Sequence, residues 1–293
     1  MGVNKNNSLH NTNGQHPPFE RGVSCLCWAY NEEELIADFL RRIDALLKAS
    51  CADYEIVVID DCSTDRTNAI VRALQQDIPQ IALYRNETNR NVGYSCQRAI
   101  REAKKEFLFW QTVDWSYDIS RLREFLEFLK THDVVAGVRR APVSQRTGAS
   151  KAIATLWLLF GRHMTKRSDT LSKAFVSVCN YLIIRVLYRF PLSDYQNVVF
   201  YRTRLIQSLK TEADSSFANP ELLLKSWWRG ASIKEVPISF IPRTAGEAKG
   251  TKLKSILKSV RDVFGFWLKW IVLGGRGPVR KGRITRLNPA EWR

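Results

Sequence analysis

The chain has 293 residues, which is enough for one large domain or for a domain with appended elements around a substantial core. Its net charge is +16, and residues 139–204 and 242–293 together supply +20, leaving −4 for the rest of the chain. Such a charge suits either nucleic acid or an anionic lipid surface, and it argues against an acidic, solvating protein.

The first residues of the chain, 1–20, are polar, rich in Asn and without hydrophobic periodicity, so we expect them to be disordered. They lack the apolar segment of a secretory signal. The six cysteines are scattered, and Cys25 and Cys27 alternate on an expected strand, so they cannot form a C-x-x-C zinc pair. We therefore expect buried free thiols and a cytoplasmic chain.

From residue 21 onwards, strand and helix patterns alternate along the chain. The expected strands are 22–30, 54–61, 81–86, 106–112 and 133–139, and the expected helices are 31–48, 63–76, 93–104 and 118–131. This alternation predicts an α/β fold with a mostly parallel, Rossmann-like sheet covered by helices. Neither G-x-G-x-x-G nor a P-loop follows the first strand, which argues against the usual dinucleotide and nucleoside-triphosphate cradles.

Beyond residue 148 the chain becomes strongly apolar with basic ends, and helices are expected at 150–164 and 171–190. A third helix, 252–273, repeats apolar residues at spacings of three and four with Lys and Arg between them. Such helices either lie in a membrane interface or pack on the protein's own core, and we favour the interface. No charge-free apolar stretch reaches the roughly 18–20 residues that span a bilayer. We therefore expect a peripheral protein on the cytoplasmic face of an anionic membrane, without a transmembrane span.

Polar signals follow each of the first strands: AYNEEE, DDCSTD and NRNVG. In an open α/β sheet, ligands bind beyond the carboxyl ends of the strands, where carboxylates can accept hydrogen bonds from a base and a ribose. The alternative interpretation is local, because acids favour a helix start and Ser63 or Asp65 can cap a helix. Capping explains the tandem Asp60 and Asp61 poorly.

These stretches together resemble the family-two glycosyltransferases of the GT-A fold, and most closely the dolichol-phosphate mannose synthase-like (polyprenyl-phosphate glycosyltransferase) group. The matching motifs, in order, are AYNEEE (29–34), VIDDCSTDRT (58–67), TVDWS (112–116), VAGVRR (135–140), DYQ (194–196) and the closing segment 217–249 with E-V-P and R-x-x-G-E-x-K. The resemblance covers about residues 22–250. It implies a GT-A domain at 21–250 with amphipathic helices inserted at 150–190, followed by an amphipathic helix and basic tail at 251–293.

The resemblance implies an inverting transfer of a hexose from a GDP- or UDP-sugar to a polyprenyl phosphate, with Mg²⁺ or Mn²⁺ as cofactor and no nucleic-acid partner. The implied donor-binding residues are Trp28, Tyr30, Glu32, Asp60 and Thr112; the catalytic residues are Asp114, Arg243 and Lys249; the metal ligands are Asp114 and Ser116; and the acceptor-phosphate residues are Arg139 and Arg204. Two alternatives stay open: the same fold acting on a saccharide or small-molecule acceptor, and a pseudoenzyme that binds a nucleotide-sugar without turning it over.

The chain departs from the group's pattern at several positions. Trp28 replaces a Pro, Thr112 replaces the first Asp of the metal motif, and Val198 and Phe200 stand where Gly and a basic residue are usual. Mg²⁺ needs only one or two protein carboxylates beside phosphate oxygens and water, so a metal site with Asp114 alone is still expected. Asp118 is expected to cap the helix that follows.

Overall fold

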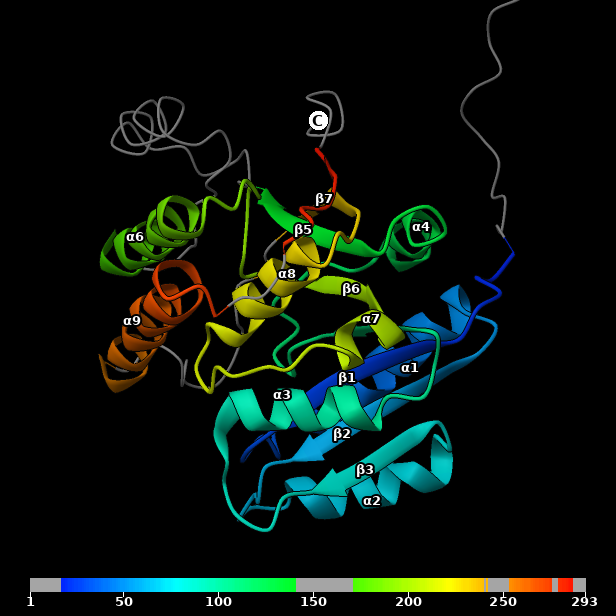
Figure 1. Ribbon diagram of the computed structural model, residues 1–293. Coiled ribbons are helices and arrows are strands. Elements are labelled where there is room, and N and C mark those ends of the chain that lie inside the picture. The colour runs from blue at the N-terminus through cyan, green and yellow to red at the C-terminus, as the bar shows by residue number, and fades with distance from the viewer. Residues whose placement is uncertain (1–16, 141–170, 240, 242–252, 276–278, 287–293) are drawn as a thin grey trace, which may run out of the picture.

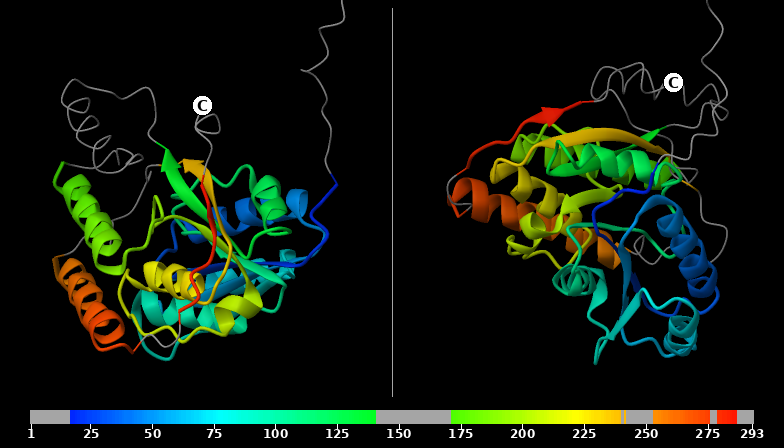
Figure 2. Two further views of the ribbon diagram at one scale, coloured as in Figure 1. Left: turned by 45° about the horizontal axis from the view of Figure 1, so that its top comes forward. Right: turned by 90° about the vertical axis from the view of Figure 1, so that its right-hand side faces the viewer.

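An eight-stranded sheet forms the middle layer of the protein, in the order β3-β2-β1-β4-β6-β5-β7-β8. The computed structural model describes residues 17–140, 171–239, 241, 253–275 and 279–286. Helices cover both faces of the sheet (Figures 1 and 2). The predicted α/β class is confirmed, because strand and helix alternate through the first half of the chain as the sequence pattern indicates.

The elements have the following bounds. The strands are β1 (Val23–Ala29), β2 (Tyr54–Asp60), β3 (Ile81–Arg85), β4 (Phe107–Trp110), β5 (Val134–Arg140), β6 (Val199–Arg202), β7 (Ile233–Ser239) and β8 (Ile284–Thr285). The helices are α1 (Ile36–Ser50), α2 (Thr67–Asp77), α3 (Asn91–Glu102), α4 (Leu122–Phe128), α6 (Leu171–Tyr188), α7 (Thr203–Gln207), α8 (Ala218–Trp228) and α9 (Leu253–Trp267), which continues as the π-helix η3 (Leu268–Val272).

Among the described strands, β6 alone runs antiparallel to its neighbours, β4 and β5. The expectation of a mostly parallel sheet is therefore confirmed, with one strand that the sequence did not reveal. Because β6 is reversed, its first residues lie at the carboxyl edge of the sheet, where β1, β2, β4, β5 and β7 end. Its last residues lie at the opposite edge, where Arg202 pairs with Phe107 at the start of β4.

Two hydrophobic layers sandwich the sheet. One layer contains residues of α3, α6, α8 and α9, and the other contains residues of α1, α2 and α4. The side chains of β1 and β2 alternate between the two layers, so both strands are largely apolar, as expected for parallel strands covered on both faces. All six cysteines are free, as expected, and burial raises the pKa of the Cys96 thiol to about 12.

Several expected boundaries change. Phe19 is fully buried and pairs with Cys51, so at least its end of the expected disordered tail is ordered, whereas residues 1–16 lie outside the described part. Helix α1 begins at Ile36 instead of residue 31, and α4 spans 122–128 instead of 118–131. The expected helix at 150–164 lies outside the described residues. Within the described ranges, no helix is long and apolar enough to cross a membrane.

Candidate functional site

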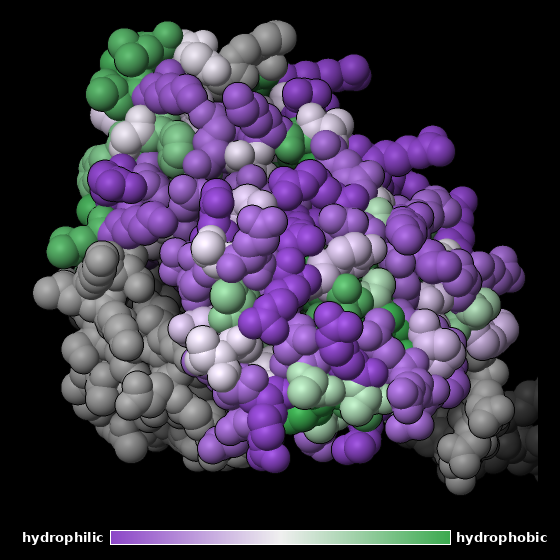
Figure 3. Space-filling view, turned by 90° about the horizontal axis from the view of Figure 1, so that it is seen from below, coloured by the Kyte–Doolittle hydropathy of each residue, from purple (hydrophilic) through white to green (hydrophobic). Residues whose placement is uncertain are grey.

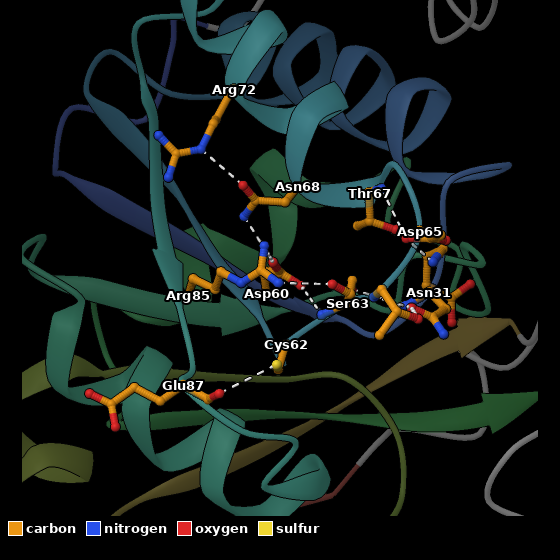
Figure 4. Close-up of polar contacts among 12 residues, drawn as sticks. Asn31, Asp60, Cys62, Ser63, Asp65, Thr67, Asn68, Arg72, Arg85 and Glu87 are labelled. Atoms are coloured by element: carbon orange, nitrogen blue, oxygen red, sulfur yellow. Dashed lines mark hydrogen bonds and ion pairs between the residues drawn. The ribbon is translucent and has the colours of Figure 1, made fainter.

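The tandem carboxylates at the end of β2 point to opposite faces of the sheet. Asp60 is completely buried on the α2 side, where Oδ1 accepts a hydrogen bond from the Ser63 amide at 2.9 Å and Oδ2 accepts one from Asn68 Nδ2 at 2.8 Å (Figure 4). The Arg85 guanidinium lies 3.6 Å from Oδ2. Asp60 was expected to hold the base or ribose, but in this structure both of its oxygens are bonded within the protein. Arg85, whose side chain is half-exposed, also donates to Ser63 O at 2.9 Å.

Asp61 lies on the α3 side and holds the β3–α3 loop. Its Oδ1 accepts hydrogen bonds from Asn86 Nδ2 at 2.6 Å and from the Arg90 amide at 2.9 Å, and its Oδ2 accepts one from the Asn91 amide at 2.9 Å. The carboxylate thus satisfies amides at the first turn of α3, where a negative charge is favoured. The Asp-Asp pair therefore fixes two neighbouring loops, a role that neither capping nor ligand binding alone predicted.

The β1–α1 and β2–α2 loops are joined by hydrogen bonds between backbone amides and side chains. The amides of residues 31, 32 and 33 donate to Ser63 Oγ, Thr67 Oγ1 and Asp65 Oδ2 at 3.0, 2.9 and 3.2 Å. Asp65 is partly desolvated, which acts to raise its pKa, but the hydrogen bonds from Thr67 and from the Glu33 amide outweigh this and lower the pKa of Asp65. The two loops consequently form one rigid rim.

Three of the expected donor residues lie at this same carboxyl edge. Trp28 is half-buried and tilts against Trp110, with ring centroids 6.3 Å apart, so its ring is partly held by the core. Tyr30 and Glu32 are also half-buried and follow β1 directly. Because the Gln111 amide donates to Leu26 O, the loop after β4 begins beside the end of β1. The structure therefore brings these three residues to the side of the sheet that carries Asp114.

The loop after β4 is closed by its own side chains. Gln111 is buried, accepts a hydrogen bond from the Thr112 amide at 3.0 Å, and donates to Tyr117 O at 2.7 Å. Asp114 Oδ1 accepts hydrogen bonds from Ser116 Oγ at 2.6 Å and from the Ser116 amide at 3.2 Å, and Thr112 Oγ1 accepts the same amide at 3.1 Å. The Thr112 side chain therefore stabilises the turn by accepting a backbone hydrogen bond, and Ser116 orients the Asp114 carboxylate.

Trp115 holds the tip of this loop against helix α1. This residue has φ of 53° and is almost buried, with its ring edge-on to Phe39 at 5.9 Å. The Arg42 guanidinium lies 4.0 Å from the ring centroid, a favourable cation–π distance. A non-glycine residue in the left-handed region carries a conformational cost, which these contacts offset. Asp114 is therefore presented on a preformed turn.

The donor set at Asp114 fits a metal only if the ligand supplies most of the coordination. Within the described ranges, no group of three His, Cys, Asp or Glu side chains could hold an ion. Asp114 is half-buried, oriented by Ser116, and stands at the edge where strand-end ligands bind. One carboxylate beside diphosphate oxygens and water is a sufficient protein contribution for Mg²⁺. The described residues thus fit a diphosphate-bound divalent cation and do not themselves form a site that would hold a metal by protein groups alone.

Two further segments meet the 112–118 loop. Tyr117 Oη donates to Gln196 O in the DYQ motif at 3.2 Å. After β7, the Ile241 amide donates to Ser116 O at 2.9 Å, and the Asp118 amide donates to Ser239 O at 2.9 Å. The Asp118 carboxylate bonds the Ser120 amide at 3.0 Å, so it caps the turn before α4 and not the first turn of α4 itself.

The expected cationic residues are only partly brought together. Arg139 is on β5 opposite Ile238 of β7, which places its backbone at the carboxyl edge. Arg243 and Lys249 lie outside the described residues, and they follow Ile241 in the chain. Arg204 is exposed on α7 at the opposite edge of the sheet, because β6 is antiparallel and the Thr203 amide bonds Glu106 O. The structure therefore does not bring Arg204 together with the Asp114 turn.

The sequence did not predict several residues that stabilise the loops around the site. Gln111, Trp115 and Tyr117 lie in the TVDWS region, but a Gln at a strand end and two aromatic residues carry no signal of a closed turn. Arg85 ends β3 and borders an open cleft of about 400 Å³ that is also lined by Arg90, Tyr94 and Arg98. The signal that could have pointed to it was the arginine at the end of a third strand beside two that end in carboxylates.

A set of exposed apolar side chains runs along α9 and η3, and we call it the α9 stripe: Leu257, Val260, Phe264, Leu268, Val272 and Leu273. These are six of the eight large apolar side chains that are exposed in the described chain. The opposite side of the same helix packs on the protein, where Val263 and Trp270 are 1% exposed. Figure 3 shows apolar atoms (green) gathered along its upper left edge, the end of the molecule where α9 lies, beside a largely hydrophilic face. One face of helix 252–273 thus packs on the protein's own core, and the other face carries the exposed apolar side chains that the interface interpretation requires.

The chain resembles characterised proteins along most of its length. The model of "Glycosyl transferase family 2" matches residues 24–190. Glycosyltransferase AglD of Haloferax volcanii is 22% identical over 90% of this chain and 38% of its own length, and a dolichol-phosphate mannosyltransferase of Pyrococcus furiosus is 23% identical over 85% and 64%. An undecaprenyl-phosphate mannosyltransferase of Micrococcus luteus is 24% identical over 75% and 84%. The chain therefore spans less than two thirds of the length of the first two relatives.

Solved structures share the fold at low identity. Glucosyl-3-phosphoglycerate synthase from Mycobacterium tuberculosis, in complex with Mn²⁺, UDP and glucosyl-3-phosphoglycerate, has a TM-score of 0.55 and 16% identity, covering 85% of this chain and 79% of that one. TarS 1–349 of S. aureus, in complex with UDP-GlcNAc, has a TM-score of 0.54 and 17% identity, covering 85% and 66%. This likeness establishes the arrangement of strands and helices and no more.

Proposed function

Because the chain belongs to glycosyl transferase family 2 and has the GT-A fold, we propose that it transfers a hexose from a nucleotide-diphospho-sugar to a polyprenyl phosphate at a membrane surface. The observation that carries the acceptor class is the α9 stripe together with its position. Helix α9 packs beside α6, as Figures 1 and 2 both show, and α6 leads directly into the DYQ loop that contacts the Asp114 turn. An apolar, basic surface thus adjoins the segment that meets the site.

The donor half of the proposal places the nucleotide on the rim formed by the β1–α1 and β2–α2 loops. Tyr30 and Glu32 would contact the base and ribose, with the exposed part of the Trp28 ring available for stacking. Asp60 would support this rim from beneath through Ser63 and Asn68, and Arg85 would face the ligand. UDP-sugars and GDP-sugars are the two donor classes to be compared, and solved neighbours of this fold contain UDP or UDP-GlcNAc.

Asp114 would hold a divalent cation, Mg²⁺ or Mn²⁺, together with the donor diphosphate. When bound, the cation neutralises charge on the departing diphosphate. Ser116 donates its hydroxyl hydrogen to Asp114 and would hold the carboxylate in position for the cation. Arg139, Arg243 and Lys249 remain candidates for contacts with donor or acceptor phosphates, because a guanidinium can bind a phosphate through two parallel hydrogen bonds.

The acceptor half of the proposal needs no strong general base. A lipid phosphate is already ionised at pH 7, so one of its oxygens can attack the anomeric carbon directly while the nucleoside diphosphate leaves from the opposite side. In-line displacement of this kind inverts the anomeric configuration. The protein's contribution is then to position the two substrates and to balance charge at the departing diphosphate.

The membrane-facing part of the proposal follows from the two faces of α9. Its buried face fixes the helix on the core through Trp270, whose ring lies edge-on to Trp228 of α8 with centroids 5.9 Å apart. Lys258, Arg261 and Lys269 lie along the same helix, as is typical of helices in a lipid interface, although Arg261 also pairs with Asp262 and Lys269 with Glu212. Attraction to anionic lipid contributes about 1 kcal/mol for each Lys or Arg near the surface.

The deciding experiment is a substrate matrix on the purified full chain. UDP- and GDP-hexoses are each offered with polyprenyl phosphate in vesicles, with soluble saccharides, and with no acceptor, and the anomeric configuration of any product is determined. Transfer to the lipid phosphate with inversion is the expected result. Transfer only to a soluble acceptor would refute polyprenyl phosphate as the acceptor. Donor binding without any turnover would make the chain a pseudoenzyme.

A further inference from the structure

Glu235, a buried acid on β7, has no role in the chemistry described so far. It is 2% exposed, and burial raises the pKa of its carboxyl group, against the effect of hydrogen bonds from Ser193. Its Oε1 accepts the Ser193 amide at 2.6 Å and its Oε2 accepts Ser193 Oγ at 3.1 Å. Burying a carboxyl group is costly, so a strand that is otherwise apolar on this face keeps it only for the bonds it makes.

Ser193 begins the loop 193–197, which contains DYQ and connects α6 to β6. Inside the loop, Asp194 Oδ1 accepts the Gln196 amide at 3.0 Å, so the loop forms a compact turn. Its far end is joined to the Asp114 turn, because Tyr117 Oη donates to Gln196 O at 3.2 Å. The side chain of Glu235 is thus hydrogen-bonded to one end of this loop, and the turn that carries Asp114 is hydrogen-bonded to the other end.

Strand β7 also reaches the Asp114 turn through its own backbone. The Asp118 amide donates to Ser239 O at the end of β7, and the Ile241 amide donates to Ser116 O just beyond it, both at 2.9 Å. Three segments therefore bond one another pairwise: β7 with the 193–197 loop through Glu235, the 193–197 loop with the 112–118 turn through Tyr117, and the turn with β7 through main-chain amides. Breaking one connection leaves the other two in place.

We propose that Glu235 is a positioning residue for the acceptor: it sets the 193–197 loop against the Asp114 turn so that the incoming phosphate and the donor meet in line. This inference rests on the proposed function for its acceptor class. Glu235 contacts neither the rim at residues 31–33 nor Asp114, so its loss should change acceptor use and leave donor binding alone.

The test compares Glu235→Ala with Glu235→Gln, because glutamine can accept the Ser193 amide and donate to Ser193 Oγ in the same geometry. For Glu235→Ala we expect KM for polyprenyl phosphate to rise, or kcat to fall, by about tenfold or more, the size expected for a lost hydrogen bond to a charged group. Affinity for UDP or GDP, measured by calorimetry, should be unchanged, and Glu235→Gln should behave nearly as the wild type. Equal losses in donor and acceptor affinity would refute the inference, as would unchanged acceptor kinetics.

Two further measurements keep the inference testable. If Glu235→Ala does not fold, Ser193→Ala weakens the connection to β7 by removing the hydroxyl bond while the backbone amide still donates to Glu235, and Tyr117→Phe removes the bond to Gln196 O. Their effects on acceptor kinetics should be non-additive. Hydrogen exchange of residues 191–198 and 112–118 should rise together in Glu235→Ala. If the wild type transfers no sugar to lipid phosphate but exchange rises in this way, the proposed function fails and the positioning role stands. If exchange does not change, the positioning role fails whatever the acceptor is.

Discussion

Restoring the missing carboxylate of the TVDWS turn is the sharpest test of the metal site. Thr112 Oγ1 and Asp114 Oδ1 both accept the Ser116 amide, at 3.1 and 3.2 Å, so these oxygens are no more than about 6 Å apart. In Thr112→Asp, two carboxylates at about 6 Å would repel by roughly 0.7 kcal/mol in water-like surroundings and about 3 kcal/mol at an effective dielectric constant of 20. The variant should therefore be less stable than the wild type at neutral pH.

The repulsion gives this variant a characteristic dependence on pH and metal. A neighbouring negative charge raises the folded-state pKa of a carboxyl group, so the cost is present above that pKa and disappears below the unfolded value of about 3.9. We expect thermal melts in EDTA at pH 7.5 to show a lower Tm for Thr112→Asp than for Thr112→Asn, which has a similar shape and no charge. Mn²⁺ with nucleoside diphosphate should restore the Tm of the Asp variant and leave the Asn variant almost unchanged. Equal Tm values for the two variants in EDTA, with no response to Mn²⁺, would refute the proposal that positions 112 and 114 face one metal site.

Three other outcomes follow from the same structure. Asp60→Ala should lower the free energy of unfolding by about 1.5–3 kcal/mol in urea titrations, because Asp60 is fully buried and bonds Ser63 and Asn68; an unchanged midpoint would mean that Asp60 is not a support of the rim. Asp65→Asn should destabilise the protein more at pH 6 than at pH 3, since the lowered pKa of Asp65 gives stability that is present above its unfolded value and lost as pH falls through its folded value; a gap independent of pH would contradict this. Glu substitutions at three positions of the α9 stripe should release the protein from anionic vesicles in flotation assays, whereas Val92→Glu, at the 44% exposed Val92 of α3, should not; equal flotation of both variants would remove the membrane surface from the proposal.

The sequence predicted the first half of the fold well because its strands are continuous apolar runs between turn residues. Ile56–Ile59 and Phe107–Trp110 are buried on both faces of the sheet, and such runs are read directly from composition. The direction of strand β6 was not predicted, because it depends on which neighbouring strands it pairs with and not on its own residues. That reversal also carries Arg204 to the edge of the sheet opposite to Asp114, which the sequence did not indicate.

The site was predicted less completely, since a residue type at a strand end does not say which way its side chain faces. Asp60 and Asp61 look equivalent in the sequence, but the alternation of a strand sends one to α2 and the other to α3. Glu235 belongs to the E-V-P motif, but the sequence did not indicate that it is buried against Ser193, which lies 42 residues away in the chain. Contacts of this separation become visible only with the fold.

The reversed strand β6 also bears on how the chain emerges during synthesis. Strands β1 to β4 pair with one another using residues 23–110, so this half of the sheet can assemble from its own sequence. The free side of β4, Phe107–Trp110, has no partner until residues 199–202 are made. An apolar, unpaired strand edge is a template for aggregation, and pairing over such a long separation is slow. Truncations that end between β4 and β6 should therefore be poorly soluble, and the nascent chain should depend on chaperones over this interval.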